Sequence, residues 1–223
     1  MKHKKNFLSI FVLMLSFAVL IVGGLVIWDT LGKETSAETP IINTDDYYSI
    51  RKNATDLQVD LYKQLLDAIK NSKSDETVAG LVAQNFVADY FTFANKLKVN
   101  DIGGLQFIDP TLKVSVYRQA KDTLYSVLLE HLNNNTVNQT LEVASVNGVS
   151  AQKIDFTLLG EEDDDGEREE SIVDAIEVVV RWTYLPSTEI DSTKYDTEAQ
   201  IILMKDGNGI YYIVGVNHEE ETQ

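Results

Sequence analysis

The pattern of apolar and polar positions opens with an apolar run over residues 7–28, preceded by Lys2, Lys4 and Lys5. About twenty helical residues cross the ~30 Å hydrocarbon core of a bilayer. A signal peptide has a shorter apolar core of roughly 7–15 residues and a small-residue cleavage site. No Ala-x-Ala site follows this run, so we favour a retained transmembrane helix over a cleaved signal. Because basic flanks stay in the cytoplasm, residues 1–6 should form a cytoplasmic tail and the remainder should face outward.

Residues 29–46 are polar, show no apolar periodicity and are expected to form a tether. A helical period of 3.6 then predicts a first helix over 47–71. The second starts at Ser74 or Asp75, runs to Leu97, and is broken by the glycines before Leu105. Its predicted buried stripe comprises Val78, Leu81, Val82, Phe86, Tyr90, Phe93 and Leu97.

Asp109-Pro110 predicts the start of a third helix that ends at Asn133, because aspartate caps helices and proline favours the first helical position. Beyond Asn135 the apolar period changes to two, as in half-buried strands. This alternation is found in five segments, at 141–146, 154–159, 176–184, 197–204 and 210–216. Asp206-Gly207-Asn208-Gly209 joins the last two and is typical of a hairpin turn.

These elements predict an α+β fold, because the connections between strands are too short for crossover helices. Residues 47–218 should form three helices packed on a curved four-stranded antiparallel sheet, followed by an acidic tail over 219–223.

Charge and cysteine content limit the possible partners and the cellular compartment of this outer domain. Of 19 basic and 35 acidic residues, four basic and one acidic fall within the first 33, which leaves 15 against 34, a net charge of −19. Because a surface with this much negative charge repels phosphate backbones, we exclude nucleic acid as a partner. The chain has no cysteine and therefore no disulfide, which suits a bacterial cell envelope better than a secreted eukaryotic module.

The residues that carry common enzyme chemistry are not arranged in recognisable motifs. Counting from Glu161, the acidic loop 161–170 resembles a calcium loop, but Arg168 and Ile172 occupy positions that need an apolar residue and a glutamate. His3, His131 and His218 have no metal-ligand spacing. We therefore assign no catalytic residue, no cofactor and no metal ligand, and leave enzymatic activity uncertain and less favoured.

A pocket between helices and sheet is the remaining candidate for chemistry. Asp89 and Tyr90, with aromatic residues of the long strand, offer a carboxylate and a phenol to an apolar cavity. Neighbouring helix positions point in different directions, so we expect Tyr90 in the core and Asp89 at the surface. The candidates for lining the pocket are Phe86, Tyr90, Phe93, Trp182 and Tyr184.

The order of elements over 47–216 resembles the nuclear transport factor 2-like superfamily of cystatin-like cones. The resemblance rests on 86–93, on Gly103-Gly104-Leu105-Gln106-Phe107, on 178–184 and on the closing hairpin. A single N-terminal span before such a domain also resembles bitopic assembly proteins of type IV secretion and conjugation, and uncharacterised anchored proteins of Gram-positive bacteria. The superfamily includes isomerases, dehydratases and binding modules, so the resemblance alone does not select a function.

The leading hypothesis is a single-pass cell-membrane protein whose outer domain binds other envelope proteins, as a scaffold in an envelope, secretion or DNA-transfer complex. The alternative is a small-molecule-binding or isomerase-like cone. A cation-responsive surface protein is a third reading. The expected partners are the membrane, through 7–28, and other envelope proteins; self-association is left open.

Overall fold

A computed structural model describes residues 41–44, 47–98, 100–126, 140–162 and 168–217 of the chain. The chain divides into two units, Met1–Glu38 and Thr39–Gln223, and only the second contains described residues. The predicted tail 1–6, transmembrane helix 7–28 and acidic tail 219–223 thus lie outside them. Within the described part, no helix is both long and apolar enough to cross a membrane.

The chain enters the domain through a short hairpin rather than a helix. Strand β1 (Ile41–Thr44) pairs antiparallel with β2 (Ser49–Arg51), and helix α2 (Asp56–Lys70) follows. The predicted tether 29–46 therefore ends in a strand, and the helix predicted over 47–71 starts nine residues later than expected. The cause is local, because Thr55 and Gln58 form a capping box that fixes the start of α2.

Helix α3 (Asp75–Tyr90) is capped by Ser74, as expected, and is enclosed on nearly all sides. One side faces α2 and the other faces the sheet, so the helix carries buried residues all round. It ends seven residues before the predicted Leu97. The chain leaves it because Phe93 and Ala94 donate backbone hydrogen bonds to Leu141 O, at 2.7 and 3.1 Å. Leu97 is 66% exposed and does not belong to the buried stripe.

The third helix starts later than predicted and is interrupted at Thr123, after which residues 124–126 are again helical. After the 3-10 turn η1 (Leu105–Phe107), helix α4 covers only Lys113–Asp122. Asp109 does not cap it: its carboxylate accepts hydrogen bonds from Thr111, and its N–H donates to Ile213 O at 3.0 Å. Asp109 and Pro110 thus form a turn beside the sheet, and residues 127–132 of the predicted helix lie outside the described part.

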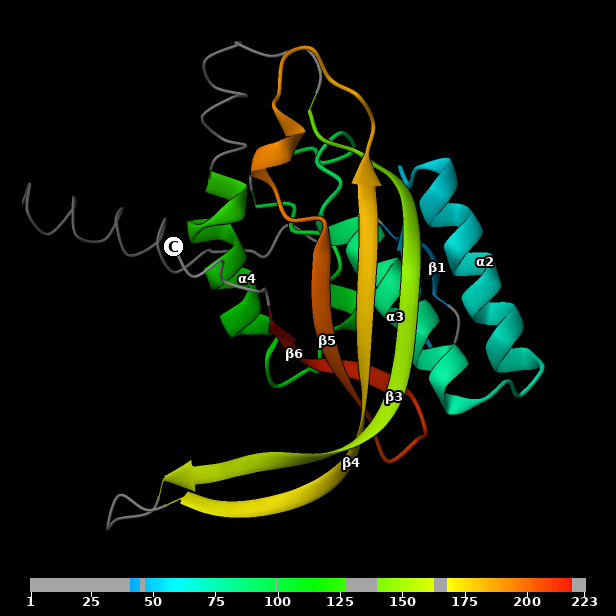
Figure 1. The fold of residues 1–223 in the computed structure, drawn as a ribbon, viewed down its shortest axis with the longest axis vertical. Helices are drawn as coiled ribbons and strands as arrows, with labels where there is room; N and C mark the ends of the chain where they lie inside the picture. The colour runs from blue at the N-terminus through cyan, green and yellow to red at the C-terminus, as the bar shows by residue number, and fades with distance from the viewer. Residues whose placement is uncertain (1–40, 45–46, 99, 127–139, 163–167, 218–223) are drawn as a thin grey trace, which may run out of the picture. The chain divides into compact units, whose positions relative to one another are not determined.

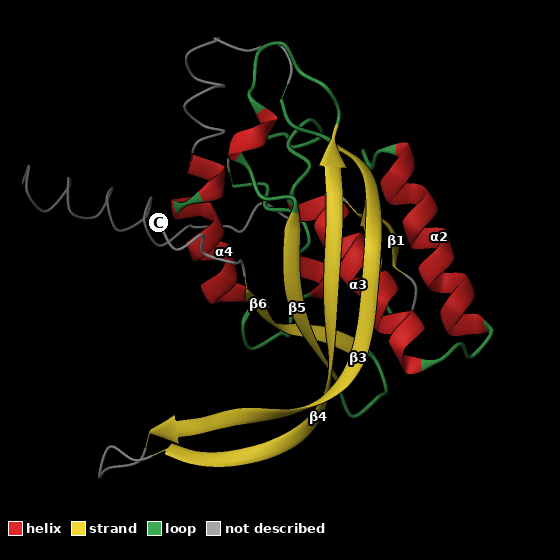
Figure 2. Cartoon of the chain, in the orientation of Figure 1, coloured by secondary structure: helices red, strands yellow, loops and turns green. Residues whose placement is uncertain are grey.

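The four-stranded antiparallel sheet predicted from the sequence is confirmed, with strand order β3-β4-β5-β6 (Figure 2). Its strands are β3 (Val143–Glu162), β4 (Arg168–Tyr184), β5 (Glu198–Lys205) and β6 (Tyr211–Asn217). Residues 143–146 and 154–159 of the two predicted segments belong to one strand, β3, which is interrupted by register shifts, whereas residues 141 and 142 precede it. A second 3-10 turn, η2 (Ser192–Lys194), lies between β4 and β5.

The predicted hairpin between β5 and β6 is confirmed. Asp206 Oδ1 accepts hydrogen bonds from the N–H groups of Asn208 and Ile210, at 2.9 and 2.8 Å. Gly209 has φ +82°, a left-handed conformation that glycine adopts without strain.

The main core lies between α3 and one face of the sheet. Alternate residues of β4, β5 and β6 line that face, as the apolar period of two predicts. They are Ile176, Val178, Val180, Trp182, Ala199, Ile201, Leu203 and Ile213, and all are buried.

Strands β3 and β4 continue beyond the rest of the sheet as a two-stranded ribbon (Figure 1). β4 pairs with β5 only over 176–181, whereas it pairs with β3 as far as Arg168. Residues 154–162 and 168–175 therefore form a hairpin arm, called the arm below.

Candidate functional site

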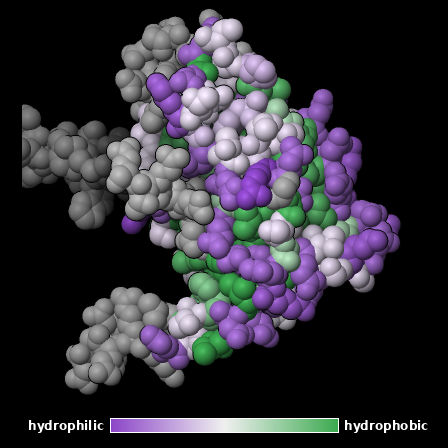
Figure 3. All heavy atoms as spheres, in the orientation of Figure 1, coloured by the Kyte–Doolittle hydropathy of each residue, from purple (hydrophilic) through white to green (hydrophobic). Residues whose placement is uncertain are grey.

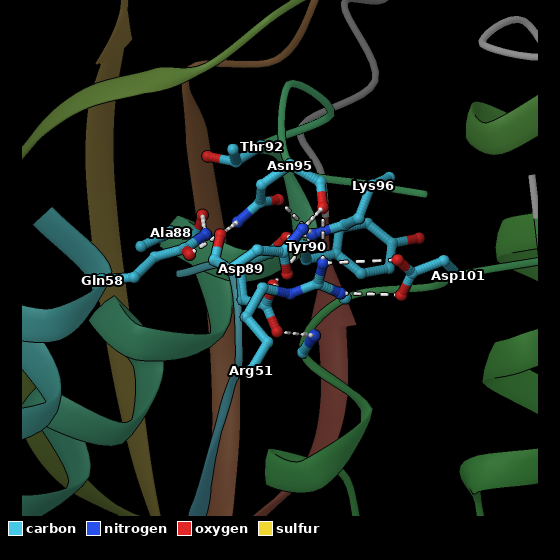
Figure 4. Close-up of polar contacts among 12 residues, drawn as sticks. Arg51, Gln58, Ala88, Asp89, Tyr90, Thr92, Asn95, Lys96 and Asp101 are labelled. Carbon is cyan, nitrogen blue, oxygen red and sulfur yellow. Dashed lines mark hydrogen bonds and ion pairs between the residues drawn. The ribbon is translucent and has the colours of Figure 1, made fainter. Parts of the chain in front are cut away.

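Four charged side chains meet inside the domain, in a cluster formed by Arg51, Asp89, Lys96 and Asp101 (Figure 4). Arg51 comes from β2 and Asp89 from the last turn of α3, while Lys96 and Asp101 come from the loop after α3. All four are buried. Two cations and two anions leave the cluster without net charge, which buried ions require.

Asp89 is the central acceptor of this cluster. Its Oδ1 lies 2.8 Å from Lys96 Nζ and 2.7 Å from Arg51 Nε, although the angle at Arg51 Nε does not make a hydrogen bond. Its Oδ2 accepts hydrogen bonds from Gly104 N at 2.8 Å and from Gln106 Nε2 at 3.1 Å. Each oxygen thus has two contacts, so the carboxylate is fully occupied by the protein.

Arg51 joins the entry hairpin to the loop after α3. Its Nη2 donates to Asp101 Oδ1 at 2.8 Å, and its Nη1 donates to Asn95 O at 3.0 Å. Asp101 Oδ2 also accepts from Leu97 N at 3.0 Å. The guanidinium and the carboxylate therefore hold the entry hairpin against the loop after α3, a geometry that suits the planar fork of arginine.

The cluster sets the protonation of its members. Burial alone would raise the pKa of Asp89, but the charges of Lys96 and Arg51 outweigh it and hold that pKa well below its usual range. Burial lowers the pKa of Lys96 to about 8, against the opposing effect of Asp89. Burial likewise disfavours the charge on Arg51, but Asp89 and Asp101 raise its pKa. All three groups are thus ionised at neutral pH.

Two glycines allow the loop to approach the end of α3. A Cβ on Gly103 would overlap Asp89 O and lie 2.6 Å from Lys96 Nζ. Gly104 has φ +76°, and a Cβ there would lie 2.7 Å from the Phe86 ring. The pair Gly103-Gly104, predicted only to break a helix, is also required by close packing.

The expectation that Asp89 lies at the surface is wrong. Because α3 packs against α2 as well as against the sheet, helix positions beside the sheet core are buried as well, and Asp89 points from one of them toward Arg51. No periodic pattern of apolar residues could show this, because the residues that cover Asp89 are themselves charged. The composition of 89–101 gave no signal either, because apolar and polar residues occur there in about the same proportion as in the whole chain.

The five residues predicted to line a pocket are divided between different parts of the core. Phe86 and Tyr90 stack with ring centroids 5.0 Å apart and border a cavity of about 150 Å³ with residues of α4 and β6. Trp182 stacks on Phe91 at 4.5 Å, and Phe93 packs on Tyr125 at 5.1 Å. Tyr184 packs near Tyr195. Only Phe86 and Tyr90 therefore border this cavity.

The cavity itself has little capacity for chemistry. Its walls are mostly apolar, formed by Ile108, Leu112, Val116 and the strand Ile213–Val216, with Gln119 as a polar side chain. Burial raises the pKa of the Tyr90 phenol to about 12, so it stays protonated at neutral pH. None of the four residues of the charged cluster lines this cavity.

A second, polar hollow lies where the arm leaves the sheet. It has a volume of about 690 Å³ and is lined by Asp155 and Asp174 of the arm, by Asp75 at the start of α3, and by Lys205 and Tyr211 of the last hairpin. Lys205 Nζ lies 2.5 Å from Asp75 Oδ1. Within the described residues, no group of three or more acidic, histidine or cysteine side chains could hold a metal ion. The centre of the acidic loop 161–170 lies outside those residues.

Comparisons with protein-family models, with curated proteins and with solved structures find no match to this chain.

Proposed function

We propose that this chain is a membrane-anchored, outward-facing domain that binds other envelope proteins, as a scaffold in an envelope, secretion or DNA-transfer complex. We also propose that the domain is related to the nuclear transport factor 2-like cones. The order of its elements, helices followed by a bent antiparallel sheet, supports this relation. The anchor over 7–28 rests on the sequence.

The observation that carries the proposal is the arm. One of its faces combines Ile154, Phe156 and Leu158 of β3 with Val173 and Ala175 of β4, because cross-strand partners point to the same side. Hydrophobic surface is visible on the arm in Figure 3. A two-stranded ribbon is marginally stable by itself, and unpaired strand edges are sites of strand addition. A ribbon with an apolar face and open edges is therefore suited to contact another protein.

The chemistry of the interior supports binding over catalysis. The buried charges satisfy one another, and their shifted pKa values follow from a closed ionic network that connects three chain segments. Structural ion-pair networks shift pKa values as catalytic sites do.

A small-molecule-binding cone is the second candidate, favoured by the apolar cavity beside Phe86 and Tyr90. Its volume of about 150 Å³ is below the roughly 300–1,000 Å³ typical of ligand sites. Only a small apolar molecule fits. Thermal denaturation with a panel of such molecules would reveal a stabilising ligand.

Crosslinking in cells tests protein binding. A photoreactive amino acid replaces Phe156, which is half-buried on the apolar face of the arm, and the matched control replaces the exposed Lys63 on α2. We expect discrete crosslinked proteins from position 156 and only diffuse background from position 63. Equal background from both positions would refute the proposal.

A further inference from the structure

The arm carries a pair of like charges that the described part of the chain does not neutralise. Asp155 of β3 and Asp174 of β4 are direct cross-strand partners, so both point to the same face of the ribbon. Both side chains are exposed, and neither forms an ion pair or hydrogen bond with another described residue. Lys153 and Lys205 line the same hollow but are paired with Glu76 and Asp75 instead. Like charges placed opposite each other destabilise a strand pair, so the arm would gain from a cation that contacts this pair directly.

The sequence of β3 supplies that cation if the strand pairs with a copy of itself. An antiparallel pair centred on Ile154 places Lys153 of each copy opposite Asp155 of the other copy. This happens twice because the arrangement has twofold symmetry. Lys153 is exposed and has only a loose contact with Glu76 at 3.7 Å, so it is accessible to a partner. The same pairing brings the two Ile154 side chains together on the apolar face.

The outer edge of β3 is open to such pairing. Among the described residues, no backbone hydrogen bond joins residues 144–158 to any segment other than β4. An edge strand of this length has a row of unpaired N–H and C=O groups, which proteins otherwise cover or shorten. The picture of the arm shows β3 along one side of the ribbon for its whole length (Figure 1).

The other edge of the arm is a poorer candidate. An antiparallel pair of two β4 strands centred on Ile172 places Glu170 opposite Asp174, two acidic side chains, on both sides of the axis. Such contacts repel. Charge complementarity thus selects β3 over β4 as the pairing edge.

We propose that two copies of this chain associate through the β3 edges of their arms, in an antiparallel pair centred on Ile154 with reciprocal Lys153–Asp155 contacts. This inference deepens the proposed function, on which it rests, by naming one partner as a second copy.

Cysteine crosslinking tests the register, since the chain contains no cysteine of its own. In the proposed pair the two copies of residue 154 lie about 4.5–5.5 Å apart between Cα atoms, a separation that a disulfide can bridge. The full chain carrying Ile154→Cys, oxidised in membranes, should form a covalent dimer. The control Ser150→Cys should not, because its two copies lie about 27 Å apart along the strands. Mixed chains carrying Gln152→Cys and Phe156→Cys should crosslink only when both are present.

Charge reversal provides a second test that needs no core substitution. Lys153→Glu or Asp155→Lys alone should lower association of differently tagged full-length chains about tenfold. The double variant K153E/D155K restores both contacts in the symmetric pair and should recover association. Equal crosslinking at positions 154 and 150, no crosslinking at 154 in a folded chain, or no recovery in the double variant would each overturn the inference. If position 156 then crosslinks to a different protein, protein binding by the arm stands without self-association.

Discussion

Lys96 Nζ lies 2.8 Å from Asp89 Oδ1 and 2.6 Å from the carbonyl oxygen of the same residue. One ammonium group thus binds both the side chain and the backbone of Asp89 at the end of α3. The loop that follows the helix is folded back onto it by this contact. Arg51 then attaches the entry hairpin to the same carboxylate, so the cluster holds the start of the domain against its middle.

Removal of the carboxylate charge should be strongly destabilising. In Asp89→Asn the buried Lys96 loses its anion and Arg51 keeps only Asp101, and breaking a buried ion pair costs about 3–5 kcal/mol. Urea denaturation would measure this loss in the free energy of unfolding. The control Asp60→Asn removes an exposed partner of Lys63 and should change that energy by about 0.5 kcal/mol or less. Similar losses in both variants would show that the cluster is not a structural element.

The decrease in the free energy of unfolding at acidic pH should depend on Asp89. Its folded pKa lies below the usual value of 3.8, so the stabilisation is fully present above pH 3.8 and is lost as the pH falls below it. Wild type should therefore lose stability between pH 4 and pH 2 more steeply than Asp89→Asn, by up to about 1.4 kcal/mol per pH unit. Parallel curves of unfolding free energy against pH would contradict this assignment.

The sheet could be predicted from the sequence, but the charged cluster could not, and the reason is physical. Strands β4 to β6 alternate between one buried and one exposed face, and Asp206 to Gly209 encode their turn locally. Helix α3 is enclosed on two sides, so its burial leaves no single apolar stripe for a periodicity argument to find. The partners of Asp89 lie up to 38 positions away at Arg51, and neither charge alone indicates the other.

The close approach at Gly103 should not tolerate a methyl group. In Gly103→Ala the new Cβ meets backbone at Asp89 and the Lys96 ammonium, and overpacking of this kind costs about 1–3 kcal/mol. Gly207→Ala is the matched control, since a Cβ there meets nothing within 4 Å. Thermal denaturation of both variants would measure the difference. A Gly103→Ala variant as stable as Gly207→Ala would mean that the loop can move away from α3 without loss.

The role of Thr55 distinguishes the observed start of α2 from the one that apolar periodicity predicts. In the structure Thr55 Oγ1 accepts from Gln58 N at 3.3 Å, and Gln58 Oε1 accepts from Thr55 N at 2.9 Å. Loss of such a cap in Thr55→Ala should cost about 1 kcal/mol. Were Thr55 inside a helix that began at Tyr47, the same substitution would instead stabilise the chain by a few tenths of a kcal/mol, because alanine is the better helix former. The sign of the change in unfolding free energy therefore decides where the helix begins, and Thr55→Ser, which keeps the hydroxyl, should remain close to wild type.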